Sequence, residues 1–237
     1  MTMIKLNIFA KSIALVSLIA IVGCTSTRSS KSAEGNPEFA SIKSAADSGD
    51  AAAQYRLAGL YDTSVPANHT EALNWYRKAA NQGNVEAQQK LGMLNSEGIG
   101  TTKNEQEAIR WYHLAADNGS AAAQARLGIA FASGEGAPQD FRQAYHWLSR
   151  AADAGNADAQ YALGKLFADG RGVARNFTEA YKWYNLASAQ GHLIATQARD
   201  SISRRMTKEQ VQEGQSRSTS YLLIKGGITN APTADLP

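Results

Sequence analysis

Four tryptophans recur at intervals of 36 residues, and this period constrains the possible fold more than any other feature of the chain. They are Trp75, Trp111, Trp147 and Trp183, and a glycine series has the same spacing: Gly83, Gly119, Gly155 and Gly191. A fixed period of this length is typical of small helical units that stack because none can bury its apolar face alone. The 237-residue chain is therefore predicted to contain a continuous array of such units.

Each unit is expected to contain two helices. The units cover residues 50–83, 84–119, 120–155 and 156–191, and residues 38–49 match the second half of a unit that would cap the array. The first helix of each unit carries Ala-Gln and then Leu at helical spacing. A small residue follows that leucine: Ala58, Gly92, Gly128 or Gly164. Glycine inside a helix costs about 1 kcal/mol relative to alanine, so its recurrence predicts close approach of two backbones.

The second helix of each unit is expected to begin after an Asn or Asp residue. These residues are Asn68, Asn104, Asp140 and Asn176, and Glu or Gln follows three residues later, at Glu71, Glu107, Gln143 and Glu179. The pattern predicts a capping box at each N-terminus. Ala-Ala, or Ala187-Ser188, and the recurring glycine then end each helix. Since the Trp-Tyr pairs are in phase with these residues, we expect them to pack between repeats and not to form a stacking platform for bases or sugars.

Glycine pairs lie between the two helices of three units. They are Gly98-Ile-Gly100, Gly134-Glu-Gly136 and Gly170-Arg-Gly172. A phosphate-binding loop is one interpretation, but none continues as a dinucleotide or Walker motif, and none follows a predicted strand. We therefore expect structural turns. The first unit differs, because residues 63–67 contain no glycine and form a turn two residues shorter.

The order Ala, Leu-Gly, Gly-x-Gly, Asn/Asp, Ala, Trp-Tyr, Ala-Ala and Gly resembles the Sel1-like repeat, an α/α-hairpin relative of the tetratricopeptide repeat. The resemblance extends from about Glu38 to Gln212. It implies an all-α fold, a right-handed α/α superhelical solenoid of about four Sel1-like helix-turn-helix repeats with terminal capping helices, over residues 38–213. It also implies an adaptor or assembly role, often at the bacterial envelope.

The segment after the last repeat resembles the ending common in this family. Thr207 and Gln210 predict a further capping box. Gly214 stands where a helix former is expected, so the final helix is predicted to be short. Residues 214–237 are then expected to form a mobile tail.

The N-terminus is predicted to be a targeting segment. Lys5 and Lys11 precede an apolar run at 13–22, which is too short to span a bilayer. The run ends at Ile21-Val22-Gly23-Cys24, which resembles the lipobox of bacterial lipoproteins. The resemblance implies a signal peptide at 1–23, acyl chains on Cys24 as a membrane anchor, and, from Thr25, an outer-membrane location facing the periplasm. Residues 24–37 are expected to form a flexible tether. An ordinary Cys24 thiol in an uncleaved helical anchor is the alternative.

Charge and motifs exclude several functions. Without Lys5 and Lys11 the chain has 22 basic and 21 acidic residues, so no nucleic-acid partner is predicted. The four histidines show no metal-ligand spacing, so no metal or cofactor is expected: His69, His113, His146 and His192. Because no catalytic motif is found, the chain is predicted not to be an enzyme, and a cell-wall-active hydrolase is the less favoured alternative.

Variable positions of the first helices are the candidate partner-binding residues. Arg56, Lys90 and Arg126 share one repeat position, which is interrupted by Ala162. Neighbouring variable residues are Tyr55, Tyr161, Met93, Ile129 and Lys165. We expect this basic stripe on the concave face to bind an acidic or extended segment of a protein or peptide, although a solvated face is the simpler interpretation. An immunity-type lipoprotein that neutralises a toxic effector and an organiser of an envelope machine are the narrower alternatives.

Overall fold

The computed structural model describes residues 37–64 and 66–226. The predicted signal peptide, Cys24, the tether up to residue 36 and residues 227–237 lie outside these ranges. Within them, all the regular structure is helical. The helices are α1 (Pro37–Asp47), α2 (Ala51–Thr63), α3 (His69–Asn81), α4 (Val85–Glu97), α5 (Glu105–Asp117), α6 (Ala121–Ser133), α7 (Phe141–Asp153), α8 (Ala157–Asp169), α9 (Phe177–Ala189), α10 (Leu193–Ser203) and α11 (Lys208–Lys225).

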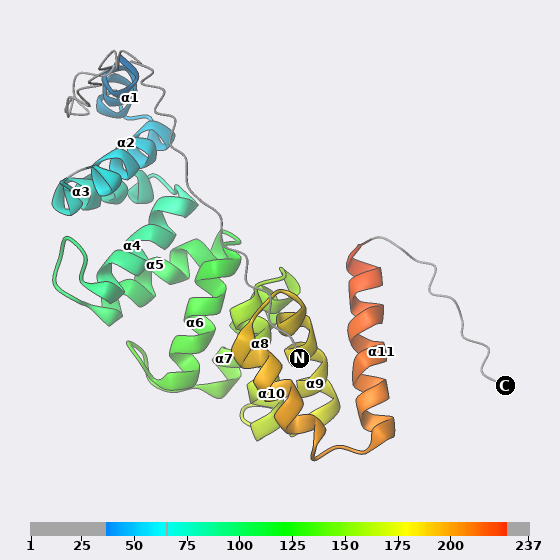
Figure 1. The fold of residues 1–237 in the computed structure, drawn as a ribbon. Helices are drawn as coiled ribbons and strands as arrows, with labels where there is room; N and C mark the ends of the chain where they lie inside the picture. Colours follow the sequence, from blue (N-terminus) through cyan, green and yellow to red (C-terminus); the bar gives the residue numbers. More distant parts are fainter. Residues whose placement is uncertain (1–36, 65, 227–237) are drawn as a thin grey trace, which may run out of the picture.

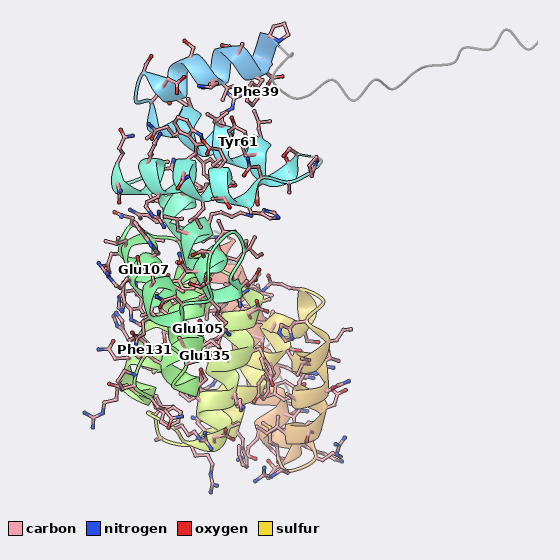
Figure 2. The ribbon with its side chains drawn as sticks, turned by 90° about the vertical axis from the view of Figure 1, so that its left-hand side faces the viewer. Phe39, Tyr61, Glu105, Glu107, Phe131 and Glu135 are labelled. Atoms are coloured by element: carbon pink, nitrogen blue, oxygen red, sulfur yellow. The ribbon has the colours of Figure 1, made fainter. Side chains whose placement is uncertain are left out.

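Successive helices pack as hairpins, and the hairpins stack into a curved array (Figure 1). The four predicted repeats are the pairs α2/α3, α4/α5, α6/α7 and α8/α9. Helix α1 covers the first repeat, where the Phe39 ring lies edge-on to Tyr61 of α2 at a centroid distance of 5.8 Å (Figure 2). The expected α/α solenoid with a leading capping helix is confirmed.

The predicted N-caps of the second helices are confirmed, but the reciprocal half of the capping box is not. The side chains of Asn68, Asn104, Asp140 and Asn176 each accept a hydrogen bond from the amide three residues later. In the described helices the reciprocal bond is found in α11, between Gln210 and Thr207. Glu71 instead accepts a hydrogen bond from Trp75 Nε1 at 2.9 Å. The glutamate therefore orients an indole one turn ahead of it.

Small residues in the first helices allow tight crossing, as predicted. A Cβ atom added at Gly92 would lie 2.5 Å from the Tyr112 ring, and one at Gly164 would lie 2.7 Å from the Tyr184 ring. Contacts this short would force the helices apart. Glycine is therefore required by the approach of the second helix of the same repeat.

The glycine pairs form structural turns, as predicted. The first glycine of each pair ends a helix in the left-handed conformation. The second packs against the preceding repeat: a Cβ on Gly100 would lie 2.6 Å from the His69 carbonyl oxygen, and one on Gly136 would lie 2.8 Å from that of Glu105. The turns therefore bring consecutive repeats into backbone contact.

The tryptophans belong to the core, as expected. Trp75, Trp147 and Trp183 are each 6% exposed, and Trp111 is half-buried. A series of buried glutamines, not anticipated from the sequence, also joins the repeats. Each side-chain amide donates to a carbonyl of the preceding second-type helix at 3.1–3.2 Å; the pairs are Gln54–Ala46, Gln88–Ala80, Gln124–Ala116 and Gln160–Ala152. These bonds satisfy carbonyl groups near the C-termini of α1, α3, α5 and α7.

The prediction of a short final helix and a mobile tail from residue 214 was wrong for residues 214–226. Helix α11 continues through Gly214 to Lys225 and packs along α9 (Figure 1). A Cβ on Gly214 would lie 2.7 Å from the Tyr181 ring, so the glycine permits this packing. Tyr221 lies against the Trp183 ring at 5.3 Å, and its hydroxyl donates to Asp153 Oδ1 at 3.1 Å. Among the described helices, none combines the length and hydropathy needed to cross a bilayer.

Candidate binding groove

Three connected hollows follow the first helices of the four repeats. The smallest, of about 130 Å³, lies between α2 and α4, and the next, of about 140 Å³, involves α4, α6 and α8. They share Gln89 and Met93. The largest, of about 330 Å³, lies between α6 and α8 and shares Ile129 and Asp158 with the second. Because neighbouring hollows share walls, they form one groove, which we call the first-helix groove.

Most of the predicted partner-binding residues line this groove. They are Tyr55, Lys90, Met93, Arg126, Ile129, Tyr161 and Lys165. Arg56 lines none of the three hollows; its side chain is 62% exposed and lies 3.6 Å from Glu38. The structure thus brings these variable positions together, with Arg56 as the exception. Whether they bind a partner stays a prediction.

The basic stripe is not a row of equivalent free cations. Lys90 Nζ lies 2.9 Å from the Asp62 carboxylate, which also lies 2.8 Å from His69 Nδ1. Burial raises the pKa of Asp62, but the hydrogen bonds from Lys90 and His69 outweigh burial, and the pKa is lowered overall. Lys90 is therefore a structural cation between the first two repeats. For Arg126 and Lys165, no ion pair forms with any other residue that the structure describes.

The largest hollow is mainly apolar, with a charged rim. Ile129, Phe141, Tyr161 and Leu166 supply large apolar or aromatic surfaces. The rim contains residues that the sequence analysis missed: Ser133, Asp158, Asp169, Arg171 and His192. Asp158 could have been found, since it follows its N-cap by two residues, as the groove residue Glu86 does. Phe141 could not, because it belongs to a second helix and reaches the hollow only through the packing of the repeats.

His192 closes one end of the largest hollow. It is the N-cap of α10, and its Nδ1 accepts a hydrogen bond from the Ala195 amide at 3.1 Å. Its Nε2 therefore carries the proton of the neutral ring and lies 3.4 Å from the Asp158 carboxylate. The ring also stacks on Tyr161, with centroids 4.9 Å apart. These three contacts fix the aromatic wall of the hollow.

The remaining histidines occupy structural positions. His113 packs against Phe131 and Trp147, and His146 packs against Trp147. In the part of the chain that the structure describes, no three His, Cys, Asp or Glu side chains gather as metal ligands would. The groove offers apolar surface, aromatic rings and fixed charges, which suit non-covalent recognition.

Comparison with known proteins identifies the repeat. The model of the Sel1 repeat matches residues 51–84, 85–120, 121–156 and 157–192. A Sel1 repeat protein from Oxalobacter formigenes is 33% identical over 77% of this chain and 78% of that one, with a TM-score of 0.63. The protein c5321, a protective antigen of uropathogenic Escherichia coli with an SLR fold, is 27% identical over 84% of this chain and 52% of its own, with a TM-score of 0.52.

One further similar structure is more distant in sequence. The immunity protein Pa5087 from Pseudomonas aeruginosa is 20% identical over 84% of this chain and 80% of its own, with a TM-score of 0.44. A search of curated proteins found no match.

Proposed function

This chain belongs to the Sel1 repeat family, and on that premise we propose that it is an adaptor that binds a protein or peptide segment along the first-helix groove. Sel1 repeat proteins are generally protein-interaction scaffolds. The observation that supports the groove is the continuity of its three hollows, which share Met93 at one junction and Ile129 at the other. A continuous groove suits an extended segment, which can place side chains in successive hollows.

Site-specific cross-linking tests this proposal. A photoreactive amino acid replaces Ile129, which lines two hollows and is 37% exposed. The control replaces Arg77, an exposed residue of the second helix α3. We expect the partner to be captured from cells at position 129 and not at position 77. Capture at position 77 alone would place the binding surface outside the groove and refute the proposal.

The captured partner also separates the narrower roles. A component of cell-wall synthesis would assign the chain to an envelope machine, and a secreted toxin would assign it to neutralisation. Catalysis is not part of the proposal, since the family is typically non-enzymatic.

We also propose that the chain is a lipoprotein anchored through Cys24, in the outer membrane and facing the periplasm. The support is the sequence Val22-Gly23-Cys24 after a basic start and an apolar run. Each methylene buried in the bilayer contributes about 0.8 kcal/mol, so several acyl chains would hold the protein firmly. Mass spectrometry of the N-terminal peptide should show an acylated Cys24, and Cys24→Ala should release the protein from membranes. An intact Met1 with an unmodified thiol would refute the anchor.

A further inference from the structure

The largest of the three hollows in the first-helix groove lies where a series of long cationic side chains is interrupted. Arg56, Lys90, Arg126 and Ala162 occupy the same position in the four repeats. Lys90 lines the hollow of about 130 Å³, and Arg126 lines that of about 140 Å³. Ala162 lines the hollow of about 330 Å³. An alanine in place of a long side chain leaves space between α6 and α8. We call this hollow the anchor pocket.

The lining of the anchor pocket suits an aromatic side chain. Phe141 and Tyr161 offer two rings, and Ile129 and Leu166 supply aliphatic surface. Tyr161 is fixed by stacking on His192, so this wall is formed before any partner binds. The volume lies near the lower limit, about 300 Å³, of pockets that enclose small molecules. One bulky side chain fits such a space, and rings gain from edge or offset contact with other rings.

The charges beside the pocket favour acidic neighbours of that side chain. Its rim carboxylates already have partners, Asp158 with His192 at 3.4 Å and Asp169 with Arg171 at 3.9 Å. Lys165, on the rim, and Arg126, in the adjoining hollow, form no ion pair with the residues that the structure describes. Over these two hollows Lys165, Arg126 and Arg171 face the two carboxylates, so with a neutral His192 the net charge around the pocket is +1 (three basic against two acidic side chains). A carboxylate on the partner would complement it.

We propose that the anchor pocket binds an aromatic side chain of an extended, acidic partner segment, and that Arg126 and Lys165 bind carboxylates of the residues flanking that side chain. This inference rests on the proposed function, since it assumes that a partner segment lies in the groove. It goes further by stating which side chains the groove selects.

Ala162→Arg provides a test in which the protein is expected to remain folded. Two other repeats carry arginine and one carries lysine at this position, so the substitution restores the series while filling the pocket. A random peptide library on phage is panned against the full-length chain in detergent, once with counter-selection on the A162R variant and once without it, so that peptides that still bind A162R are also recovered. Circular dichroism and urea unfolding verify that the variant is folded. We expect the retained peptides to carry Trp, Tyr or Phe next to Asp or Glu.

Isothermal titration calorimetry with one such synthetic peptide then measures how much the aromatic residue of the peptide and each cation of the protein contribute to the affinity. Replacing the peptide's aromatic residue by alanine, or using A162R protein, should weaken binding about tenfold or more. The Arg126→Ala and Lys165→Ala proteins should bind more weakly, with a loss that decreases at high salt. Arg56→Ala is the matched control: it removes a cation at the same repeat position but outside the groove hollows, and it should leave binding unchanged.

A second variant separates failure of this inference from failure of the proposed function. Met93→Lys alters the two smaller hollows, and Lys165 shows that lysine is accepted at the equivalent position. Two results would overturn the proposal for the anchor pocket but retain the proposal that the groove binds a partner. In the first, M93K weakens peptide binding but A162R binds the peptides normally; in the second, the recovered peptides lack aromatic and acidic residues. If no recovered peptide responds to either variant, both proposals are overturned.

Discussion

The Lys90 ammonium lies 2.9 Å from the Asp62 carboxylate and so joins α4 to α2. The Asp62 side chain is only 13% exposed, and the approach of His69 Nδ1 to 2.8 Å completes the cluster. The first repeat has the shortened turn without a glycine pair. At the junction between the first two repeats, this ionic cluster is therefore a specific link that the sequence period does not reveal.

Lys90→Ala should destabilise the protein, by about 1 kcal/mol at pH 7. The pKa of Asp62 is lowered in the folded state, so its contribution is present above the unfolded value of about 4 and is lost as the pH falls through the folded value. Urea unfolding at pH 7 and pH 3 should therefore show a difference between wild type and K90A that decreases at pH 3. Arg126→Ala, without an ion pair in the described structure, should change stability by less than about 0.5 kcal/mol. Equal losses in both variants would contradict this role of Lys90.

Gly136 is required by both its conformation and its neighbour, whereas Gly119 is required by conformation alone. Both have positive φ, +75° and +90°. A Cβ on Gly136 would lie 2.8 Å from the Glu105 carbonyl oxygen, and one on Gly119 would meet no atom within 4 Å. Gly119→Ala should cost about 1–2 kcal/mol from left-handed strain. Gly136→Ala should cost at least about 1 kcal/mol more, because adjacent repeats must separate. Thermal and urea unfolding measure the loss of stability in each variant. Similar losses of stability in the two variants would argue against the contact between repeats at Gly136.

The periodic part of the structure could be predicted from the sequence because each recurring residue acts within its own repeat or on the next one. Helix caps such as Asn104, turns such as Gly134-Glu-Gly136 and tight crossings such as Gly128 depend on local geometry, and they occur as expected. The candidate groove residues were predicted because they differ between repeats, whereas the residues around them recur. Tyr161 and Lys165 line the first-helix groove and Arg56 lies outside its hollows, while partner binding by these residues stays a prediction.

Helix α11 and the anchor pocket could not be predicted in this way. Both depend on contacts between residues that are not at equivalent positions of the 36-residue repeat. Helix α11 is stabilised by the Tyr181 and Trp183 rings of α9, so Gly214 acts as a packing residue and not as a helix end. The anchor pocket combines Phe141 of α7 with residues of α6 and α8 and with His192, the N-cap of α10. A single sequence contains no signal for such a combination.

Two equivalent tryptophans should respond differently to the same substitution. Trp75 and Trp147 are both 6% exposed, but Trp75 Nε1 donates to Glu71, whereas the buried Trp147 Nε1 has no partner among the described residues. Replacement by phenylalanine removes a satisfied donor in one case and an unsatisfied donor in the other. Trp147→Phe should therefore cost about 1–2 kcal/mol less than Trp75→Phe. Urea unfolding compares the two variants, and a larger loss for W147F would show that the donor is satisfied in solution.

Tyr221 packs against Trp183 and donates a hydrogen bond to Asp153, so it stabilises the docking of α11 on the repeats. We expect this stabilisation to decrease at alkaline pH. Burial, with the nearby Asp153 charge, raises the pKa of Tyr221 to about 12. Because the folded value exceeds the unfolded value of about 10, the stabilisation is complete below pH 10 and is lost as the pH rises from 10 to 12.

Tyr221→Phe should cost about 1 kcal/mol at pH 9, where the hydroxyl still donates to Asp153. Urea unfolding at pH 9 and pH 11 should show a gap between wild type and Y221F that narrows at pH 11. Burial also raises the pKa values of Tyr76, Tyr112 and Tyr184, so both proteins should lose stability in alkali. These tyrosines are common to both proteins, and the change in the gap therefore isolates Tyr221. A gap that stays constant between the two pH values would mean that ionisation of Tyr221 does not oppose the docking of α11.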